Sequence, residues 1–155
     1  MAQQHRTSVL LRMLSLWPPY LGAGIRVRAS ADLRTFDVRM KLRFWNRNYV
    51  NTHFGGSLYS MCDPFFMLIL VQALGRGYVV WDKAATIRFR RPGKGTVRAT
   101  FHIPQERVEE IRAAADRGEK IEPVFTAEVR DEQGEVVAEV EKLLYIRLAK
   151  PPGGG

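Results

Sequence analysis

One acidic residue, Asp63, lies inside a largely apolar stretch, and this position points most directly to chemistry. From Leu58 to Leu74 the chain carries no other charge. A helix that is apolar on every side is normally buried, and a buried carboxylate costs free energy unless a partner or a reaction uses it. Burial tends to raise the pKa of a carboxyl group, which suits a general base working near neutral pH.

A glycine pair, Gly55 and Gly56, comes just before this stretch in a polar turn. Glycine lets the backbone approach a ligand closely, and free amides at a helix N-terminus stabilise a developing negative charge. The pair therefore indicates either an oxyanion site or a tight turn. The same turn holds Asn51 and His53, which are candidates for substrate binding or, alternatively, residues that hydrogen-bond the loop backbone.

Asp63 also has a purely structural interpretation, because Pro64 follows it. Asp is a favoured N-cap and Pro a favoured first residue of a helix, so Asp63 could cap a helix and do no chemistry. If the helix instead runs through Asp63, Pro64 kinks it and re-aims the carboxylate. The sequence leaves both interpretations open.

Alternating apolar and polar residues predict strands on both sides of the apolar stretch. We expect strands over residues 25–30, 36–44, 78–91, 97–103, 121–130 and 136–148. Turn signals between them favour an antiparallel sheet, and a short helix after Pro104 buries Val108, Ile111 and Ala115. The predicted class is α+β, a long central helix wrapped by a curled antiparallel sheet of about six strands.

A chain of 155 residues predicts one domain, over residues 1–150. An amphipathic helix over about residues 4–17 is expected to end at Pro18 and Pro19 and to pack on the domain, the alternative being a membrane-surface helix. Residues 151–155 are expected to be a disordered tail. The central run is too short for a membrane span, and no signal-peptide cleavage site follows the first helix, so we predict a cytoplasmic protein.

The net charge of +8 favours anionic partners, which include nucleic acid, an anionic membrane surface or a small phosphorylated ligand. The positive charges alternate with apolar residues, as on the solvated face of a sheet, and no nucleic-acid-binding motif is present, so no specific nucleic-acid partner is predicted. Cys62 is the only cysteine, which rules out an internal disulfide. The histidines and this cysteine do not have metal-ligand spacing, so no metal site is predicted.

The segment from Gly55 to Asp63 resembles that of the PaaI-like acyl-CoA thioesterases, which have the hot-dog fold. In those proteins a Gly-Gly pair opens the central helix, and an acidic residue follows the second glycine by seven positions, as Asp63 follows Gly56. Residues 86–92 are similar to the family strand that runs beside the helix and ends at an Arg-Pro turn. The resemblance covers roughly Leu33 to Leu148 and indicates an uncharacterised branch close to these thioesterases.

The resemblance implies that Asp63 activates water, or attacks directly, at a thioester carbonyl, while an amide at Gly55 or Gly56 stabilises the oxyanion. It implies acyl-CoA as substrate, no separate cofactor, and a homodimer or homotetramer with active sites at subunit interfaces. Coenzyme A carries phosphates, which the cluster Arg88, Arg90, Arg91, Lys94 and Arg98 could bind. The expected substrate-binding residues are His53, Asn51, Tyr59, Ser60, Arg88, Arg90 and Arg91.

Two departures from the family pattern keep a second function open. The family places a histidine directly before the glycine pair, but here Phe54 separates His53 from Gly55, and Pro64 follows the acidic residue. Both departures favour a non-catalytic hot-dog protein that binds an acyl group or acyl-CoA. A hot-dog dehydratase is a further enzyme option, but the histidine-led motif expected of one is missing. Asp82 is a further acidic candidate, although a regular strand would point Asp82 and Lys83 to opposite faces.

Overall fold

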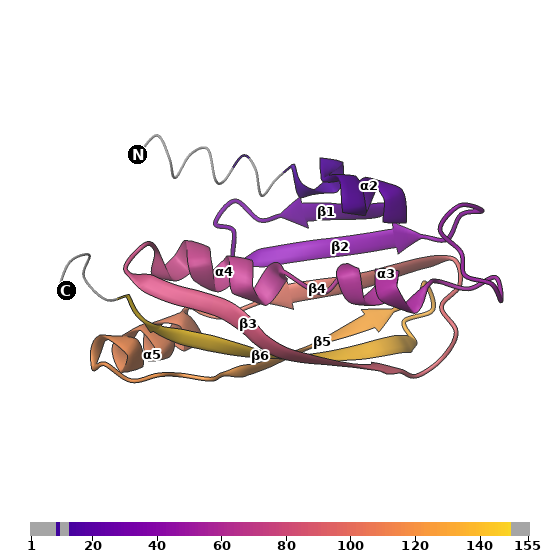
Figure 1. The fold of residues 1–155 in the computed structure, drawn as a ribbon. Coiled ribbons are helices and arrows are strands. Elements are labelled where there is room, and N and C mark those ends of the chain that lie inside the picture. Colours follow the sequence, from indigo (N-terminus) through magenta and orange to yellow (C-terminus); the bar gives the residue numbers. More distant parts are fainter. Residues whose placement is uncertain (1–8, 10–12, 150–155) are drawn as a thin grey trace.

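The computed structural model describes residue 9 and residues 13–149. Within these residues, six strands form one antiparallel sheet in the order β1-β2-β4-β5-β6-β3, which curls around the central helices (Figure 1). This arrangement confirms the predicted α+β class and the hot-dog fold. The elements are η1 (Leu14–Leu16), α2 (Pro18–Ala23), β1 (Ile25–Ala29), β2 (Thr35–Lys41), α3 (Gly55–Ser60), α4 (Phe65–Leu74), β3 (Tyr78–Phe89), β4 (Thr96–His102), α5 (Gln105–Asp116), β5 (Val124–Arg130) and β6 (Val136–Leu148).

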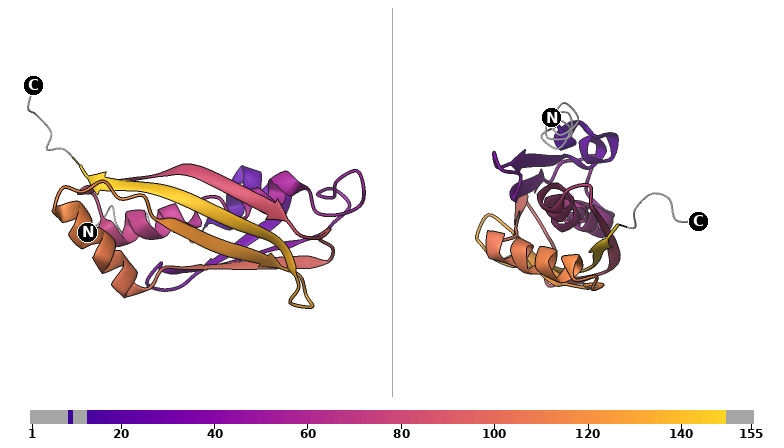
Figure 2. Two further views of the ribbon diagram at one scale, coloured as in Figure 1. Left: turned by 90° about the horizontal axis from the view of Figure 1, so that it is seen from below. Right: turned by 90° about the vertical axis from the view of Figure 1, so that its left-hand side faces the viewer.

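The core lies between α4 and the inner face of the sheet. Phe65 of α4 stacks on Phe101 of β4 with 4.8 Å between ring centroids, and its centroid is 5.3 Å from that of Phe36 on β2. Burial of one such aromatic side chain contributes about 2 kcal/mol. As the sequence predicts, α5 buries Val108, Ile111 and Ala115, and this helix lies at one end of the sheet (Figure 2).

The apolar stretch forms two helices, because the chain turns at residues 61–64 between α3 and α4. Proline has no N–H group to continue a helical ladder, and α4 begins at the residue after Pro64. Gly75, with φ of 86°, follows the last residue of α4. By length and composition alone Gly55–Leu74 could cross a membrane, but its helices lie against the inner face of the sheet, and Leu58, Ile69 and Leu70 are buried in the core.

The N-terminal helix expected over residues 4–17 lies largely outside the described residues. Within residues 13–17 the chain forms only the 3-10 turn η1. Trp17, the residue before the two prolines, is extended and follows the end of η1. Pro18 and Pro19 begin a further helix, α2, where the fixed φ of proline suits the first turn. Tyr20 of α2 is buried, and its hydroxyl donates to the Ser60 carbonyl at 2.9 Å. The tail expected to be disordered, 151–155, also lies outside the described residues.

The strand expected over residues 36–44 is shorter, since β2 ends at Lys41. The amide group of Asn46 explains the early end. Its Oδ1 accepts from the Arg43 amide at 2.7 Å, and its Nδ2 donates to the Lys41 carbonyl at 2.9 Å, which turns the chain out of the sheet. Phe44, predicted to face the core, is therefore 79% exposed on a loop.

The edge strand β3 contains a bulge. Asp82 pairs with Leu144 and Ala84 pairs with Leu143, so Lys83 is left out of the register. An extra residue in one strand reverses the alternation beyond it and re-aims side chains. Asp82, just before the bulge, faces inward opposite the buried Leu144, and the bulge lets Ile87 after it face inward as well, opposite Val140. Trp81 faces outward and stacks on Tyr145 at 4.8 Å.

Candidate active site

Asp63 lies in the turn between α3 and α4, and two side chains donate hydrogen bonds to its Oδ1 atom. The Tyr59 hydroxyl donates at 2.6 Å and the Lys142 ammonium at 2.9 Å. The Asp63 side chain is 49% exposed, so solvent reaches it. Pro64, not Asp63, occupies the N-cap position of α4, and no side chain caps that helix. The interpretation of Asp63 as a helix cap is therefore wrong.

Lys142 is the residue that the sequence interpretation missed. Its side chain is fully buried, and its ammonium forms ion pairs with Asp63 at 2.9 Å and with Asp82 at 3.1 Å. It also donates to the Tyr59 hydroxyl oxygen at 3.2 Å. A buried ammonium is costly unless it is paired, and two carboxylates supply the pairing. A signal was present, because Lys142 occupies an inward position of β6 between two core residues, Val140 and Leu144.

Asp82 is a second carboxyl group at the site, and its pairing with Leu144 of β6, just before the bulge, places it there. Its Oδ2 pairs with Lys142, while its Oδ1 is buried without a hydrogen-bond partner among the described residues. Burial raises the pKa of Asp82 above its usual value, although Lys142 acts in the opposite direction. An unpartnered buried carboxylate oxygen is uncommon in folded proteins and marks a place where a proton or a ligand could be held.

The electrostatics of the cluster keep Asp63 ionised. Burial acts to raise the pKa of Asp63, but the hydrogen bonds from Tyr59 and Lys142 outweigh it and lower the pKa below its usual value. Burial acts to lower the pKa of Lys142, and the hydrogen bond to Asp63 helps to raise it instead. The expectation of a raised pKa at Asp63 is wrong because a buried cation, not only apolar surface, lies beside the carboxylate.

The glycine pair opens α3, as the resemblance implies. Gly55, Tyr59 and Asp63 are four residues apart and lie along one side of the chain, which faces β3. A Cβ atom on Gly55 would come within 2.9 Å of the Phe89 ring of β3. Among the described hydrogen bonds, the amides of Gly55 and Gly56 have no backbone acceptor. The first amides of a helix ordinarily have no acceptor within the helix, and the Phe54 ring lies close to Gly56, where a Cβ atom would come within 2.5 Å of it.

Ser60 has different neighbours from Tyr59, although the two are adjacent in α3. Its hydroxyl donates to the Gly56 carbonyl at 2.8 Å. Ser60 also lines a shallow hollow of about 490 Å³ with Trp45 and Phe54 from the preceding loop. The two expected substrate-binding residues of α3 thus differ in what their side chains contact. The Tyr59 hydroxyl bonds the Asp63 carboxylate, whereas Ser60 contacts Asp63 through the backbone, where its carbonyl accepts from the Asp63 amide at 3.4 Å.

His53 and Asn51 hold the turns around the glycine pair. The imidazole of His53 is buried and hydrogen-bonds the Gly95 carbonyl through Nε2 at 3.0 Å, so Nε2 carries the proton. Burial lowers the pKa of His53, which keeps the ring neutral. Asn51 has a φ of 63° and its amide donates to the Asn48 carbonyl at 3.1 Å. These contacts belong to loops and do not include Asp63.

The three arginines expected to bind substrate lie near the end of β3 and interact with glutamates. Arg90 pairs with Glu139 at 2.6 Å, and Arg88 is directly opposite Glu139 in the strand register. Arg91 pairs with Glu135 at 2.9 Å. Within the described structure none of the three contacts the cluster around Asp63, so the structure does not bring this part of the expected site together.

A family model described as "Domain of unknown function (DUF4442)" matches residues 6–146 of the chain. No curated protein matches this chain.

Solved structures with this fold include a thioesterase and a probable thioesterase. Pseudomonas aeruginosa PA5026, described as a protein of unknown function and probable thioesterase, is 25% identical with a TM-score of 0.80, over 92% of this chain and 96% of that one. Haemophilus influenzae thioesterase HI1161 is 14% identical with a TM-score of 0.65, over 93% and 92%. The Escherichia coli PaaI protein of the phenylacetic acid degradation operon is 19% identical with a TM-score of 0.58, over 96% and 92%. The last two comparisons support the fold alone.

Proposed function

The chain belongs to the family of the domain of unknown function DUF4442, and from that premise we propose that it hydrolyses a thioester of the acyl-coenzyme A class. The observation that carries the proposal is the half-exposed carboxylate of Asp63, which Tyr59 and Lys142 hold in place. The probable thioesterase PA5026, which is 25% identical to this chain, supports the reaction class.

Asp63 supplies the base or the nucleophile in this proposal. Its lowered pKa leaves it ionised at neutral pH, so it can take a proton from a water molecule as that water attacks the thioester carbonyl. Alternatively it attacks the carbonyl itself, and water then hydrolyses the resulting anhydride. In both routes the carbon–sulfur bond breaks and coenzyme A leaves as its thiolate, while the amides of Gly55 and Gly56 donate to the oxyanion.

Lys142, Asp82 and Tyr59 position Asp63. The hydrogen bonds from Tyr59 and Lys142 both end on Oδ1, which leaves Oδ2 of Asp63 for water or substrate. Asp82 binds the other side of the ammonium and holds it beside Asp63. Cys62 is unsuited to act as the nucleophile, because burial raises the pKa of its thiol to about 12.

One observation favours the second candidate, a protein that binds acyl-CoA without hydrolysing it. A carboxylate with a lowered pKa is a weaker base than one tuned toward neutrality, and the ion pair of Asp63 could serve only to stabilise Lys142.

We also propose that the protein is a cytoplasmic homo-oligomer that needs no cofactor beyond its thioester substrate.

The experiment that tests the proposal is an assay of the purified full-length chain against a panel of acyl-CoA thioesters, with free thiol as the product measured. Oxygen-ester analogues serve as matched controls, and calorimetry on the same panel measures binding. Release of thiol from at least one thioester at an enzymatic rate supports hydrolysis. Measurable binding of acyl-CoA without thiol release from any member would contradict hydrolysis and support the binding protein.

A further inference from the structure

Four arginines stand in a row across the outer face of the sheet. The strand register pairs Arg26 of β1 with Arg39 of β2, Arg39 with Arg98 of β4, and Arg98 with Arg130 of β5. All four residues are exposed, whereas the residues between them along the strands, such as Val38, are buried in the core. Neighbouring strands lie about 4.8 Å apart, so the row extends over about 15 Å.

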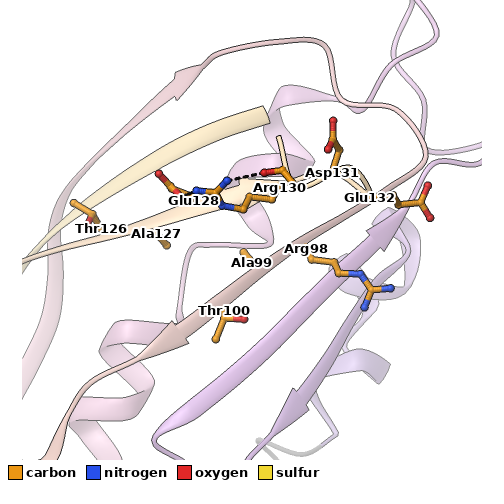
Figure 3. A pocket seen from close by; sticks show the side chains of 10 residues that line it. Arg98, Ala99, Thr100, Thr126, Ala127, Glu128, Arg130, Asp131 and Glu132 are labelled. Atoms are coloured by element: carbon orange, nitrogen blue, oxygen red, sulfur yellow. Dashed lines mark hydrogen bonds and ion pairs between the residues drawn. The ribbon is translucent and has the colours of Figure 1, made fainter. Parts of the chain in front are cut away.

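This arginine row opposes the stability of the free protein, because like charges directly opposite each other on neighbouring strands repel. Arg130 is bound by Glu128 and by the Gly134 carbonyl. Arg39 and Arg98 have no acidic or hydrogen-bonding partner among the described residues. All 16 acidic residues of the sequence lie in the described part of the chain, so the search for acidic partners of these two arginines covers every Asp and Glu. Figure 3 shows the contrast between Arg130, joined to its partners, and the unpaired Arg98.

Two hollows flank β4 along the arginine row. One, of about 380 Å³, lies over β1, β2 and β4, and its lining includes Arg26, Arg28, Arg39 and Arg98 but only one carboxylate, that of Asp37. The other, of about 850 Å³, lies over β4 and β5, which pair only through Arg98 and Arg130, and its lining includes three carboxylates, those of Glu128, Asp131 and Glu132 (Figure 3). The volume of each is within the range of small-molecule sites.

We propose that the arginine row binds a compact ligand with two or more phosphate groups, seated in the hollow between Arg39 and Arg98. A guanidinium group matches phosphate oxygens with two parallel hydrogen bonds, and bound phosphate removes the repulsion along the row. Among the described residues no aromatic side chain lines either hollow, so this part of the chain offers no platform for the stacking that holds single-stranded nucleic acid. The chemistry favours a small polyphosphate over a polymer.

This site is separate from the one around Asp63. The arginines extend from the outer face of the sheet, whereas Lys142 and Asp63 meet on the inner face. Binding at the arginine row therefore goes beyond the proposed hydrolysis, and either can fail without the other.

The test measures thermal unfolding and calorimetric binding of the full chain with inorganic pyrophosphate, against sodium chloride at equal ionic strength. The variants are Arg39→Gln and Arg98→Gln. The matched control is Arg107→Gln, which removes one exposed positive charge from α5. Without pyrophosphate, we expect each test variant to melt at a higher temperature than the parent, because the repulsion between neighbouring arginines is relieved. The control variant should not melt at a higher temperature than the parent. Pyrophosphate should raise the melting temperature of the parent and of the control, and each test variant should bind it about tenfold more weakly.

Three results would overturn the proposal. The first is a melting temperature that pyrophosphate raises no more than sodium chloride does. The second is an equal loss of binding in Arg107→Gln, which would indicate attraction to the overall charge only. The third is a short single-stranded oligonucleotide that binds more tightly than pyrophosphate at equal phosphate concentration and loses binding in the test variants, which would assign the row to an extended polyanion.

Discussion

The charge state of Asp63 depends on Lys142, because the ammonium 2.9 Å away offsets the cost of burying the carboxylate. Lys142 in turn depends on two carboxylates, since its side chain has no access to water. A buried cation shared by two anions is a coupled unit, so each change at one member is expected to change the protonation of the others.

Replacing Lys142 with Met tests this dependence while keeping a similar side-chain volume. Without the ammonium the pKa of Asp63 rises, so the acidic limb of the pH profile of kcat/KM should move to higher pH. Leaving two carboxylates without their cation should also cost on the order of 3 kcal/mol of folding free energy. Lys142→Arg keeps the charge and should retain the parent's acidic limb.

Lys83→Met is the control for that measurement, because Lys83 is an exposed neighbour that pairs with Glu122 at 2.5 Å. It should leave the pH profile unchanged. An acidic limb that stays in place in Lys142→Met would show that Lys142 does not set the charge of the catalytic group.

The sequence supports only part of this residue-scale account. The glycine-to-acid spacing of Gly56 and Asp63 identified the carboxylate, and the alternation of β6 contained Lys142 on the core face. Alternation alone cannot show what pairs with an inward lysine, because its partners come from α3, from the turn after α3 and from β3, all far away in the chain.

At the scale of elements, His53 fixes the turn after β3 to the segment before α3. Its amide donates to the Gly93 carbonyl at 2.9 Å and its ring bonds the Gly95 carbonyl. The ring of His53 and the side chain of Val137 also leave no room for a Cβ atom at Gly93 without displacement. His53 therefore belongs to the packing of three segments.

His53→Ala should lower the folding free energy by about 1–3 kcal/mol, because a buried hydrogen bond is lost, and should leave kcat nearly unchanged. The lowered pKa of His53 means that the unfolded chain binds a proton more readily than the folded one. Stability of the parent should thus fall as the pH drops below about 6.5. Thermal unfolding between pH 5 and 7 measures this slope, which should shrink in His53→Ala.

His102→Ala removes an exposed histidine of β4 and serves as the control, with the parent's slope retained. A large loss of kcat in His53→Ala, with little change in stability, would contradict the structural role and return His53 to the substrate-binding site.

The element boundaries show where the sequence stops being informative. Periodicity placed all six strands, but it could not reveal the bulge at Lys83, since one unpaired residue leaves a similar apolar pattern. It also extended β2 to Phe44, because the hydrogen bonds of Asn46 that turn the chain away are made with Ala23 and Lys41 after folding.

At the scale of the whole molecule, the two edges of the sheet differ. The edge at β1 is covered by η1, where the Ser15 hydroxyl oxygen accepts from the Val27 amide at 2.7 Å. At the other edge, β3 exposes Ala84, Ala85 and Thr86, small residues that let another strand approach. An uncovered edge strand is a template for pairing with a second chain.

We therefore expect a dimer in solution, joined through β3, with twice the monomer mass in light scattering. The double variant Ala84→Lys/Thr86→Lys should shift the mass toward the monomer, because lysines on an edge strand oppose pairing. Ala113→Lys on the exposed face of α5 is the control. A parent that stays monomeric at high concentration would contradict the expectation of a β3 dimer.

The architecture was the most predictable level, because an apolar stretch between amphipathic strands has few ways to be buried other than inside a curled sheet. The strand order β1-β2-β4-β5-β6-β3 was not predictable in the same way. It depends on which turns are tight and which connections cross the sheet, and local patterns do not specify that.

The most direct test of the central claim is the rate of thiol release from acyl-CoA by Asp63→Asn, compared with the parent and with Asp116→Asn. Asp116 is a carboxylate on α5 that bonds the Tyr78 hydroxyl, so its variant controls for loss of a charge. A catalytic Asp63 predicts a kcat at least about 10²-fold lower in Asp63→Asn, with Asp116→Asn unchanged. Parent-like turnover by a folded Asp63→Asn would contradict the account and leave Asp63 only as the ion-pair partner of Lys142.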